Sequence, residues 1–288
     1  MYRSLEEICK EAAATGCSFW ELIQKDDCRE RQIAQEESFV QLQRMYQAMK
    51  EADQDYDATL RSRSGLVGTD GGKLEHYVEQ EEPICGDFLG RVMEKAVKMG
   101  ESNACMKRIV AAPTAGACGV VPAVFLSMQE KYHYTDEEMT KALYVASGIG
   151  GVIASRAFIA GAQGGCQAEI GSASAMAAGG AVHLRGGSVE AVAHAAAMAL
   201  KNLLGLVCDP VAGLVEVPCV KRNVSGAVVA LSAADMALAG VRSRIPPDEV
   251  IDAMREVGIS MPACLRETGE GGLAATPEGI KMRDRIMD

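Results

Sequence analysis

The feature that most constrains the fold of this chain is a long segment, residues 144–199, that is almost free of charge. Its only charged side chains are Arg156, Glu169, Arg185 and Glu190, and most other positions hold Gly, Ala or Ser. The alternation of β-branched and polar residues that is typical of strands is nearly absent. A helix that is apolar on every side is a buried helix. The sequence therefore predicts a mainly α fold, a compact helical domain with buried Gly/Ala-rich helices at its centre.

Amphipathic helices are predicted before this segment. Ser4 with Glu7 and Ser18 with Glu21 have the spacing of capping boxes. Apolar residues then recur at helical spacing among many polar ones. Residues 1–60 are therefore predicted to form a pair of amphipathic surface helices, the second one long. The alternative is an arm that docks on a partner.

The domain organisation follows from the same pattern. Pro246 and Pro247 are typical of the first turn of a helix. No linker clearly divides the chain, so we expect one catalytic domain over residues 1–288. Residues 61–245 would form the core with its metal and substrate sites, and residues 246–288 the C-terminal helices and tail.

Composition narrows the compartment and the partners. A net charge of −10 over 288 residues argues against a nucleic-acid partner, which usually requires a basic surface. Ten cysteines with no CxxC pair, and a first ten residues without an apolar secretory region, fit a reducing cytoplasm. The uncharged run between Lys141 and Arg156 is shorter than the roughly 18 residues that a bilayer requires. We expect a cytoplasmic protein with no membrane or nucleic-acid partner.

Three cysteines stand out because glycine, proline or a carboxylate flanks each of them. Cys166 lies in GGCQAE, Cys208 in VCDPVAG and Cys219 in EVPCVKRN. Turns and helix ends fix the direction of a side chain, so the three sulfurs can meet in one cavity. Three thiolates would hold three irons of a four-iron cluster and leave the fourth iron open to a substrate. On spacing alone, the alternative is three buried, inert thiols.

Two loops rich in Gly and Pro, residues 62–73 and 111–123, are predicted to bind a small carboxylate. The first contains four glycines and is expected to be irregular throughout. Successive amides in a turn form an anion-binding nest. A nucleotide phosphate fits less well, because neither a Walker A pattern nor a GxGxxG at the start of a βαβ unit occurs. The alternative is that the glycines only permit tight turns. The candidate substrate-binding residues are Ser64, Gly65, Thr69, Asp70, Gly71, Gly72, Thr114, Ala115 and Gly116, with Arg222 or Asn223 as additional candidates.

The catalytic base is not assigned by the sequence. All four histidines lie outside the cysteine segments and the two loops, and we expect them at surface or packing positions: His76, His133, His183 and His194. Glu169 and Asp209 lie close to the cysteines. Either could cap a helix, orient a ligand or act as a base whose pKa is raised by an apolar environment.

At these segments the chain resembles the α subunit of the bacterial iron–sulfur L-serine dehydratases. The resemblance covers nearly the whole chain and rests on SGLVGTDGGK, AAPTAGACGVVPA, GGCQAEIGSASAMAAGG and LGLVCDPVAGLVEVPCVKRN. It implies that Cys166, Cys208 and Cys219 hold a [4Fe–4S] cluster with one open iron site. It also implies an oxygen-sensitive reaction without pyridoxal phosphate, the dehydration and deamination of L-serine to pyruvate and ammonia in amino-acid catabolism.

The resemblance further implies a partner, because in the two-subunit form a separate β chain carries an α/β domain and an ACT-type domain. Single-chain relatives often have a histidine in the helix before the second cluster cysteine, where this chain reads KNLLG (201–205). A proton-transfer role for that histidine does not carry over, and the base is then expected on the β chain. Two alternatives remain: a related iron–sulfur lyase that acts on L-cysteine, and a subunit that only scaffolds a partner. Cys118 lies inside the second loop, so its role is also open.

Overall fold

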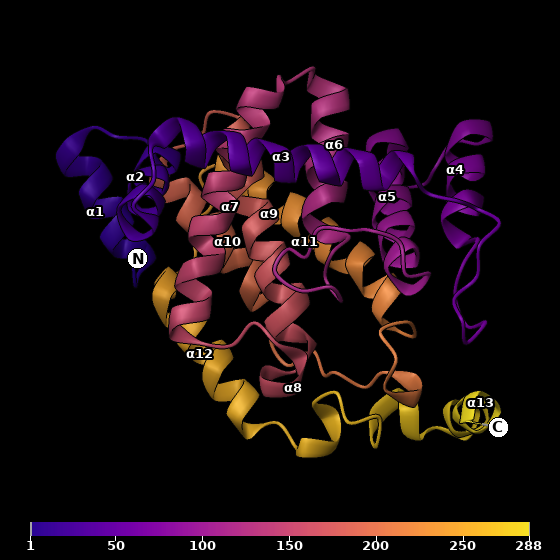
Figure 1. The fold of residues 1–288 in the computed structure, drawn as a ribbon. Helices are drawn as coiled ribbons and strands as arrows, with labels where there is room; N and C mark the ends of the chain where they lie inside the picture. The colour runs from indigo at the N-terminus through magenta and orange to yellow at the C-terminus, as the bar shows by residue number, and fades with distance from the viewer. Residues whose placement is uncertain (1, 288) are drawn as a thin grey trace.

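The computed structural model describes residues 2–287, which form a bundle of helices without a strand (Figure 1). The α-helices are α1 (Leu5–Thr15), α2 (Phe19–Arg31), α3 (Gln35–Gln54), α4 (Asp70–Gln80), α5 (Gly86–Ala104), α6 (Val120–Tyr132), α7 (Asp136–Arg156), α8 (Gly161–Gly164), α9 (Ser172–Leu184), α10 (Val189–Lys201), α11 (Cys219–Leu238), α12 (Pro247–Ser260) and α13 (Pro277–Met287). A π-helical turn, η1 (Gln167–Gly171), and the short 3₁₀ turns η2 (Val211–Gly213), η3 (Ala263–Leu265) and η4 (Gly272–Ala275) complete the chain. The predicted mainly α fold is confirmed.

Helix α9 lies in the middle of the bundle, with α7, α10 and α11 packed around it (Figure 1). All of its residues from Ser172 to Val182 are buried. A Cβ atom at Gly180 would lie 2.3 Å from Cζ of Phe125 on α6 and 3.2 Å from the carbonyl oxygen of Ala142 on α7. The neighbouring helices can therefore approach α9 closely only because this position has no side chain. The prediction of buried Gly/Ala-rich helices at the centre is confirmed.

Three helices form the N-terminal region, where a pair was predicted. The capping box of Ser18 and Glu21 begins α2 as expected. The chain turns twice before α3, because Gly16 after α1 and Gln32 after α2 both adopt left-handed backbone conformations. Helix α3 lies across the bundle and packs on α5, α6 and α7 (Figure 1), with Tyr46 fully buried against the core.

The glycine-rich segment 62–73 is partly helical, which differs from the prediction of an irregular loop. Its last four residues begin α4, after Thr69 in a left-handed conformation. The full entropic cost of glycine applies to the interior of a helix, whereas Gly71 and Gly72 lie in the first turn of α4. Gly71 also allows a close approach to α5, because a Cβ atom would lie 2.7 Å from Cγ of Lys98.

Helix α8 and the C-terminal elements lie at one end of the bundle, opposite the turn between α6 and α7 (Figure 1). Helix α12 begins with Pro247 at its first position, as predicted, and packs against α8 and η1. Helix α13 packs against η2 and η4. Within residues 2–287, no helix has both the length and the apolar character needed to cross a membrane.

Candidate active site

Two of the three singled-out cysteines meet at this end of the bundle, together with a carboxylate. The Sγ atoms of Cys166 and Cys208 and a carboxylate oxygen of Glu169 all lie within 4.8 Å of one another. Both cysteines are only 2 % exposed. Cys166 directly precedes η1, and Glu169 lies inside this π-helical turn. Turns of this kind are frequent at functional sites. The arrangement places two thiols and a carboxylate around one point.

A long-range pairing holds Cys208 in place. Its amide donates to the carbonyl oxygen of Leu265 (2.8 Å), and its carbonyl oxygen accepts from the amide of Glu267 (2.7 Å). Cys208 and Arg266 thus form an isolated parallel bridge. Glu267 has a positive φ of 65°, which a residue with a side chain rarely adopts. The segment after α12 therefore supports the cysteine from more than fifty positions further along the chain.

Glu267 also brings a second carboxylate toward the site. A Cβ atom built on Gly161 would lie 2.8 Å from Oε2 of Glu169, 2.9 Å from Sγ of Cys208 and 3.3 Å from Oε2 of Glu267. The two carboxylates and the thiol thus surround the same glycine. Sequence reasoning missed Glu267, because only the tertiary pairing with Cys208 places it here.

Cys219 is the first residue of α11 and is 7 % exposed. It does not belong to the group of ligand atoms within 4.8 Å, among the residues that the structure describes. It is close enough for the charge on Cys166 to affect it: burial, and then that charge, raise the pKa of the Cys219 thiol to about 12. The third cysteine therefore lies at the start of α11, outside the group formed by Cys166, Glu169 and Cys208.

The predicted substrate residue Asn223 connects Cys219 to the 111–119 loop. Its Oδ1 accepts from the amide of Gly119 (2.8 Å), and its Nδ2 donates to the carbonyl oxygens of Gly116 (2.9 Å) and Cys219 (3.1 Å). Asn223 is 1 % exposed. Because the amide group is occupied by backbone partners at both ends, it positions the loop and the cysteine.

The second predicted loop lies directly against the site. The Thr114 hydroxyl donates a 2.6 Å hydrogen bond to Oε1 of Glu169. A Cβ atom on Gly116 would lie 3.2 and 3.4 Å from the two oxygens of that carboxylate. The amides of Ala115 and Gly116 donate to no group within residues 2–287. Thr114, Ala115 and Gly116 thus lie beside Glu169, and the amides of Ala115 and Gly116 have no hydrogen-bond partner among the described residues.

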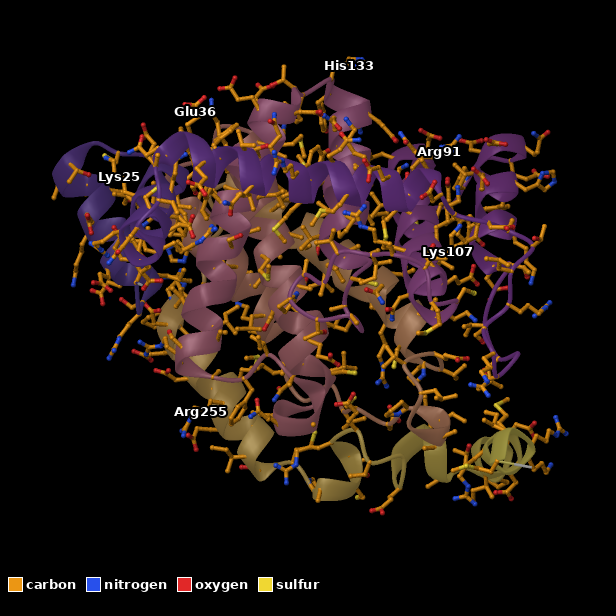
Figure 2. The ribbon with its side chains drawn as sticks, viewed as in Figure 1. Lys25, Glu36, Arg91, Lys107, His133 and Arg255 are labelled. Atoms are coloured by element: carbon orange, nitrogen blue, oxygen red, sulfur yellow. The ribbon has the colours of Figure 1, made fainter. Side chains whose placement is uncertain are left out.

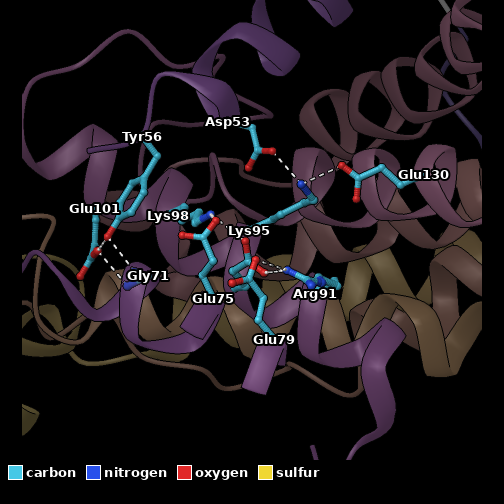
Figure 3. A network of polar contacts seen from close by, with 12 residues as sticks. Asp53, Tyr56, Gly71, Glu75, Glu79, Arg91, Lys95, Lys98, Glu101 and Glu130 are labelled. Carbon is cyan, nitrogen blue, oxygen red and sulfur yellow. Dashed lines mark hydrogen bonds and ion pairs between the residues drawn. The ribbon is translucent and has the colours of Figure 1, made fainter. Parts of the chain in front are cut away.

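The first predicted loop does contain an anion nest, but a side chain of the chain fills it. The amides of Gly68, Asp70 and Gly71 donate to the Glu101 carboxylate at 2.9–3.1 Å. The Tyr56 hydroxyl donates to Oε2 of Glu101 (2.6 Å) and accepts from the Gly72 amide (3.1 Å). Figure 3 shows Glu101 between Tyr56 and Gly71, at the edge of a larger network of charged side chains. The amides of Gly68, Asp70 and Gly71 therefore hold a carboxylate from α5, and Gly72 acts on it through Tyr56.

The beginning of that loop contacts the Cys219 segment through Glu216. The Ser62 hydroxyl donates to Oε2 of Glu216 (2.8 Å), and the Ser64 hydroxyl donates to the same oxygen. Lys221 on α11 pairs with Asp70 at 3.1 Å. Ser64, Gly65 and Asp70 thus lie beside the segment that carries the third cysteine.

Contact between the sulfurs shifts the acidities of the first two thiols in opposite directions. A hydrogen bond with Cys208 lowers the pKa of the Cys166 thiol, whereas the same contact and burial raise the pKa of the Cys208 thiol. The chain alone therefore opposes full ionisation of its cysteines. A bound metal would favour the ionised thiols, because a thiol that coordinates a metal is deprotonated. Buried sulfur donors are typical of iron–sulfur clusters and of zinc sites. The donor set fits a cluster.

The carboxylates of Glu169 and Asp209 differ in the number of groups that bind their oxygens. Burial raises the pKa of the Glu169 carboxyl above its ordinary value, and the charge of Glu267 adds to this, while the bond from Thr114 opposes it. Asp209 is held by the Leu273 amide (2.7 Å) and by Arg222 (2.8 Å). Glu169 therefore keeps one oxygen for chemistry. Asp209 accepts a hydrogen bond only through Oδ2 among the described residues, and its Oδ1 is held by the ion pair with Arg222.

The other residues that the sequence left open lie away from this group. Cys118 is fully buried, packs with Ala52 and Met99, and donates to the carbonyl oxygen of Met99 (3.7 Å). Burial raises the pKa of its thiol to about 12. His133 lies at the far end of the bundle (Figure 2), and burial lowers the pKa of His183. Within residues 2–287, no histidine joins the cysteine group.

Comparison with known proteins agrees with this geometry. The family described as serine dehydratase alpha chain matches residues 14–274. A probable L-serine dehydratase alpha chain of Bacillus subtilis is 46 % identical over 287 residues, 100 % of this chain and 96 % of that protein. The L-serine dehydratase alpha chain of Peptoniphilus asaccharolyticus is 42 % identical, over 98 % and 96 % of the two chains. The L-serine dehydratase TdcG of Escherichia coli is 46 % identical over 182 residues, which cover 62 % of this chain and 40 % of that protein. The chain therefore belongs to the serine dehydratase alpha chain family, a family of lyases.

Proposed function

We propose that this chain is the catalytic α subunit of a [4Fe–4S]-dependent, pyridoxal-independent enzyme that converts L-serine to pyruvate and ammonia. The observation that carries the proposal is the group formed by Cys166, Cys208 and Glu169, in a member of the serine dehydratase alpha chain family. Cys166, Cys208 and Cys219 are the proposed cluster ligands. All three are nearly inaccessible to water, which protects such a cluster.

The bound cluster would supply Lewis-acid chemistry at the substrate hydroxyl, through an iron without a protein thiolate. The chain's own residues would bind and orient the rest of L-serine. The free amides of Ala115 and Gly116 are the proposed donors to the substrate carboxylate, and the Thr114 hydroxyl fixes the neighbouring Glu169. Holding the substrate in the reactive orientation lowers the activation barrier of the reaction by several kcal/mol, an order-of-magnitude value for well-oriented groups.

We propose Glu169 as the proton acceptor within this chain. Its Oε1 is held by Thr114, and its Oε2 faces Gly161 and the Cys208 sulfur. A half-buried carboxyl with a raised pKa is a better base than an exposed one. Asp209, the other candidate from the sequence, is paired with the Arg222 cation and accepts from the Leu273 amide, so its charge is already compensated. This proposal replaces the expectation that the base lies on a β chain.

The other predicted substrate residues receive an indirect role in this proposal. Ser64 steadies the Cys219 segment through Glu216, and Asp70 does so through Lys221. Gly65 closes the same turn, because its amide donates to the carbonyl oxygen of Ser62. Thr69, Gly71 and Gly72 fix the start of α4 around Glu101. Asn223 joins Cys219 to the substrate loop.

We further propose one domain over residues 1–288 and a separate β subunit as partner. One hydrophobic cluster draws on residues from Tyr2 to Met254, which supports a single domain. The alpha-chain names of the relatives support a second subunit. All ten cysteines are free thiols, which supports a reducing compartment such as the cytoplasm.

Anaerobic reconstitution tests the proposal. The chain is loaded with iron and sulfide, alone and with its β chain, and ammonia release is measured from L-serine and from L-cysteine. We expect about four iron and about four sulfide per chain, and a preference for L-serine. A preference for L-cysteine would make the chain a sulfide-releasing lyase, and zinc or no metal on a well-folded chain would refute the cluster.

A further inference from the structure

A single arginine contacts the segments of all three cysteines. Arg222 lies on the first turn of α11, three positions after Cys219, with its side chain 15 % exposed. Its Nη1 lies 3.5 Å from Sγ of Cys166 and donates to the carbonyl oxygen of Val207 (2.8 Å). Its Nη2 pairs with Asp209 at 2.8 Å. The guanidinium therefore bridges the residues on both sides of Cys208 to the Cys166 sulfur.

Asp209 is itself rigidly held. It is 3 % exposed, and its Oδ2 accepts from the Leu273 amide (2.7 Å). A Cβ atom on Gly272 would lie 2.3 Å from the same oxygen, and Gly272 has a φ of +57°. The turn η4 thus closes tightly over Asp209. The carboxylate cannot swing away from Arg222 without moving this turn.

We propose that Arg222 is a positioning residue that holds the three cysteine segments in register and keeps a permanent positive charge beside the Cys166 sulfur. The proposal rests on the proposed [4Fe–4S] site. An arginine stays charged at any physiological pH, and its planar fork can engage several acceptors at once. Hydrogen bonds and charge near the sulfurs tune both the retention and the reduction potential of a cluster.

This role differs from the one that the sequence suggested. Arg222 was a candidate for binding the substrate carboxylate, but its guanidinium is engaged by Cys166, Val207 and Asp209. Loss of its positive charge disfavours negative charge on the cluster. The reduction potential should therefore become more negative, and the iron should be released faster.

Two substitutions separate charge from geometry. Arg222→Gln removes the positive charge. Arg222→Lys keeps the charge but loses the planar guanidinium that contacts several acceptors at once. Each protein is purified anaerobically with its β chain and loaded with iron and sulfide. Iron release to a chelator and a redox titration followed by electron paramagnetic resonance are then measured. We expect iron release about 10- to 100-fold faster in Arg222→Gln, together with a more negative potential. Arg222→Lys should release iron faster than the wild type but keep a potential close to it.

Arg156→Gln is the matched control. Arg156 forms a comparable two-bond pair with Asp252 (3.0 and 2.5 Å) between α7 and α12, and makes no contact with the cysteines. It should leave iron release and potential unchanged. Wild-type behaviour of Arg222→Gln, or equal changes in the control, would overturn the role of Arg222. If Arg222→Gln fails to fold, the Arg222→Lys protein tests the proposal in its place. Iron release from Arg222→Lys at the wild-type rate would then refute the proposal. A wild-type chain that binds no cluster would refute the cluster site and this role together.

Discussion

The Thr114 hydroxyl donates a 2.6 Å hydrogen bond to Oε1 of Glu169, which connects the 111–119 loop to the turn that follows Cys166. The second oxygen of that carboxylate faces Gly161 and the Cys208 sulfur. A hydrogen bond to a charged acceptor contributes about 1.5–3 kcal/mol. Thr114 therefore fixes the direction in which Glu169 points its free oxygen.

The first prediction concerns this bond. Thr114→Val keeps the shape of the side chain but removes the donor, so Glu169 loses its fixed orientation. We expect kcat/KM for L-serine to fall about 10- to 100-fold, which corresponds to the cost of one charged hydrogen bond. Thr114→Ser keeps the hydroxyl and should retain most of the activity. Steady-state kinetics under anaerobic conditions, with iron content as control, measure the effect. Full activity in Thr114→Val would show that this bond does not serve the reaction.

The second prediction concerns the pH dependence of stability in the metal-free chain. Burial raises the folded-state pKa of the Glu169 carboxyl above its ordinary value of 4.5, so the folded chain binds this proton more tightly than the unfolded chain does. The ionised carboxyl therefore lowers stability as the pH rises from the ordinary pKa through the raised one. Glu169→Gln removes this penalty.

The substituted chain should accordingly be more stable than the wild type at about pH 8, and the gap should shrink toward about pH 5. Urea unfolding of both metal-free proteins at the two pH values measures the gap. A gap that is equal at both pH values would mean that the carboxyl does not carry a burial penalty.

Sequence reasoning was most successful where all partners lie within a few positions. The capping box of Ser18 and Glu21 begins α2 at Phe19, as its spacing indicated. The uncharged segment formed the buried centre, because composition alone decides how close helices can pack. The nest around Gly71 was also visible in the sequence. Its occupant, Glu101, was not, because it lies one helix further along the chain.

The site shows the same limit. The contexts of Cys166 and Cys208 indicated fixed sulfurs, but the pairing of Cys208 with Arg266 joins segments that no local pattern connects. Glu267 could therefore not be found from the sequence. Arg222 was noticed, but which group it contacts depends on how α11 packs against the turn before η1.

The third prediction tests the nest at the start of α4. Glu101 is 2 % exposed and accepts from three amides and from Tyr56. Glu101→Gln replaces an acceptor by a donor that faces those amides. We expect a loss of about 2–4 kcal/mol in the free energy of unfolding.

Tyr56→Phe removes one bond and should cost only about 1 kcal/mol. Urea unfolding of the wild type and both variants gives these values. A Glu101→Gln chain that unfolds like the wild type but loses affinity for L-serine would instead indicate that the nest serves the substrate.

The fourth prediction separates functional cysteines from packing ones. Cys208→Ala should abolish the visible absorbance of the cluster and the dehydration of L-serine together, since a three-thiolate site cannot lose a ligand. Cys118→Ala should keep both, because its fully buried sulfur packs against Met99. It should cost about 1 kcal/mol of stability for the small cavity. Iron analysis, absorbance and thermal unfolding distinguish the two. Retention of cluster and rate in Cys208→Ala would refute its assignment as a ligand.

The last prediction uses the glycine at the centre of the site. A Cβ atom on Gly161 would lie 2.8 Å from Oε2 of Glu169 and 2.9 Å from Sγ of Cys208, closer than real Cβ contacts occur. Gly161→Ala should therefore displace both groups and reduce iron affinity and activity about 10- to 100-fold. Helix α8 itself should tolerate alanine, which is favoured over glycine by about 1 kcal/mol in a helix. Ala162→Ser changes the exposed neighbour and should leave iron, activity and stability unaltered. If Gly161→Ala bound iron and turned over L-serine like the wild type, the reacting groups would not converge on this position.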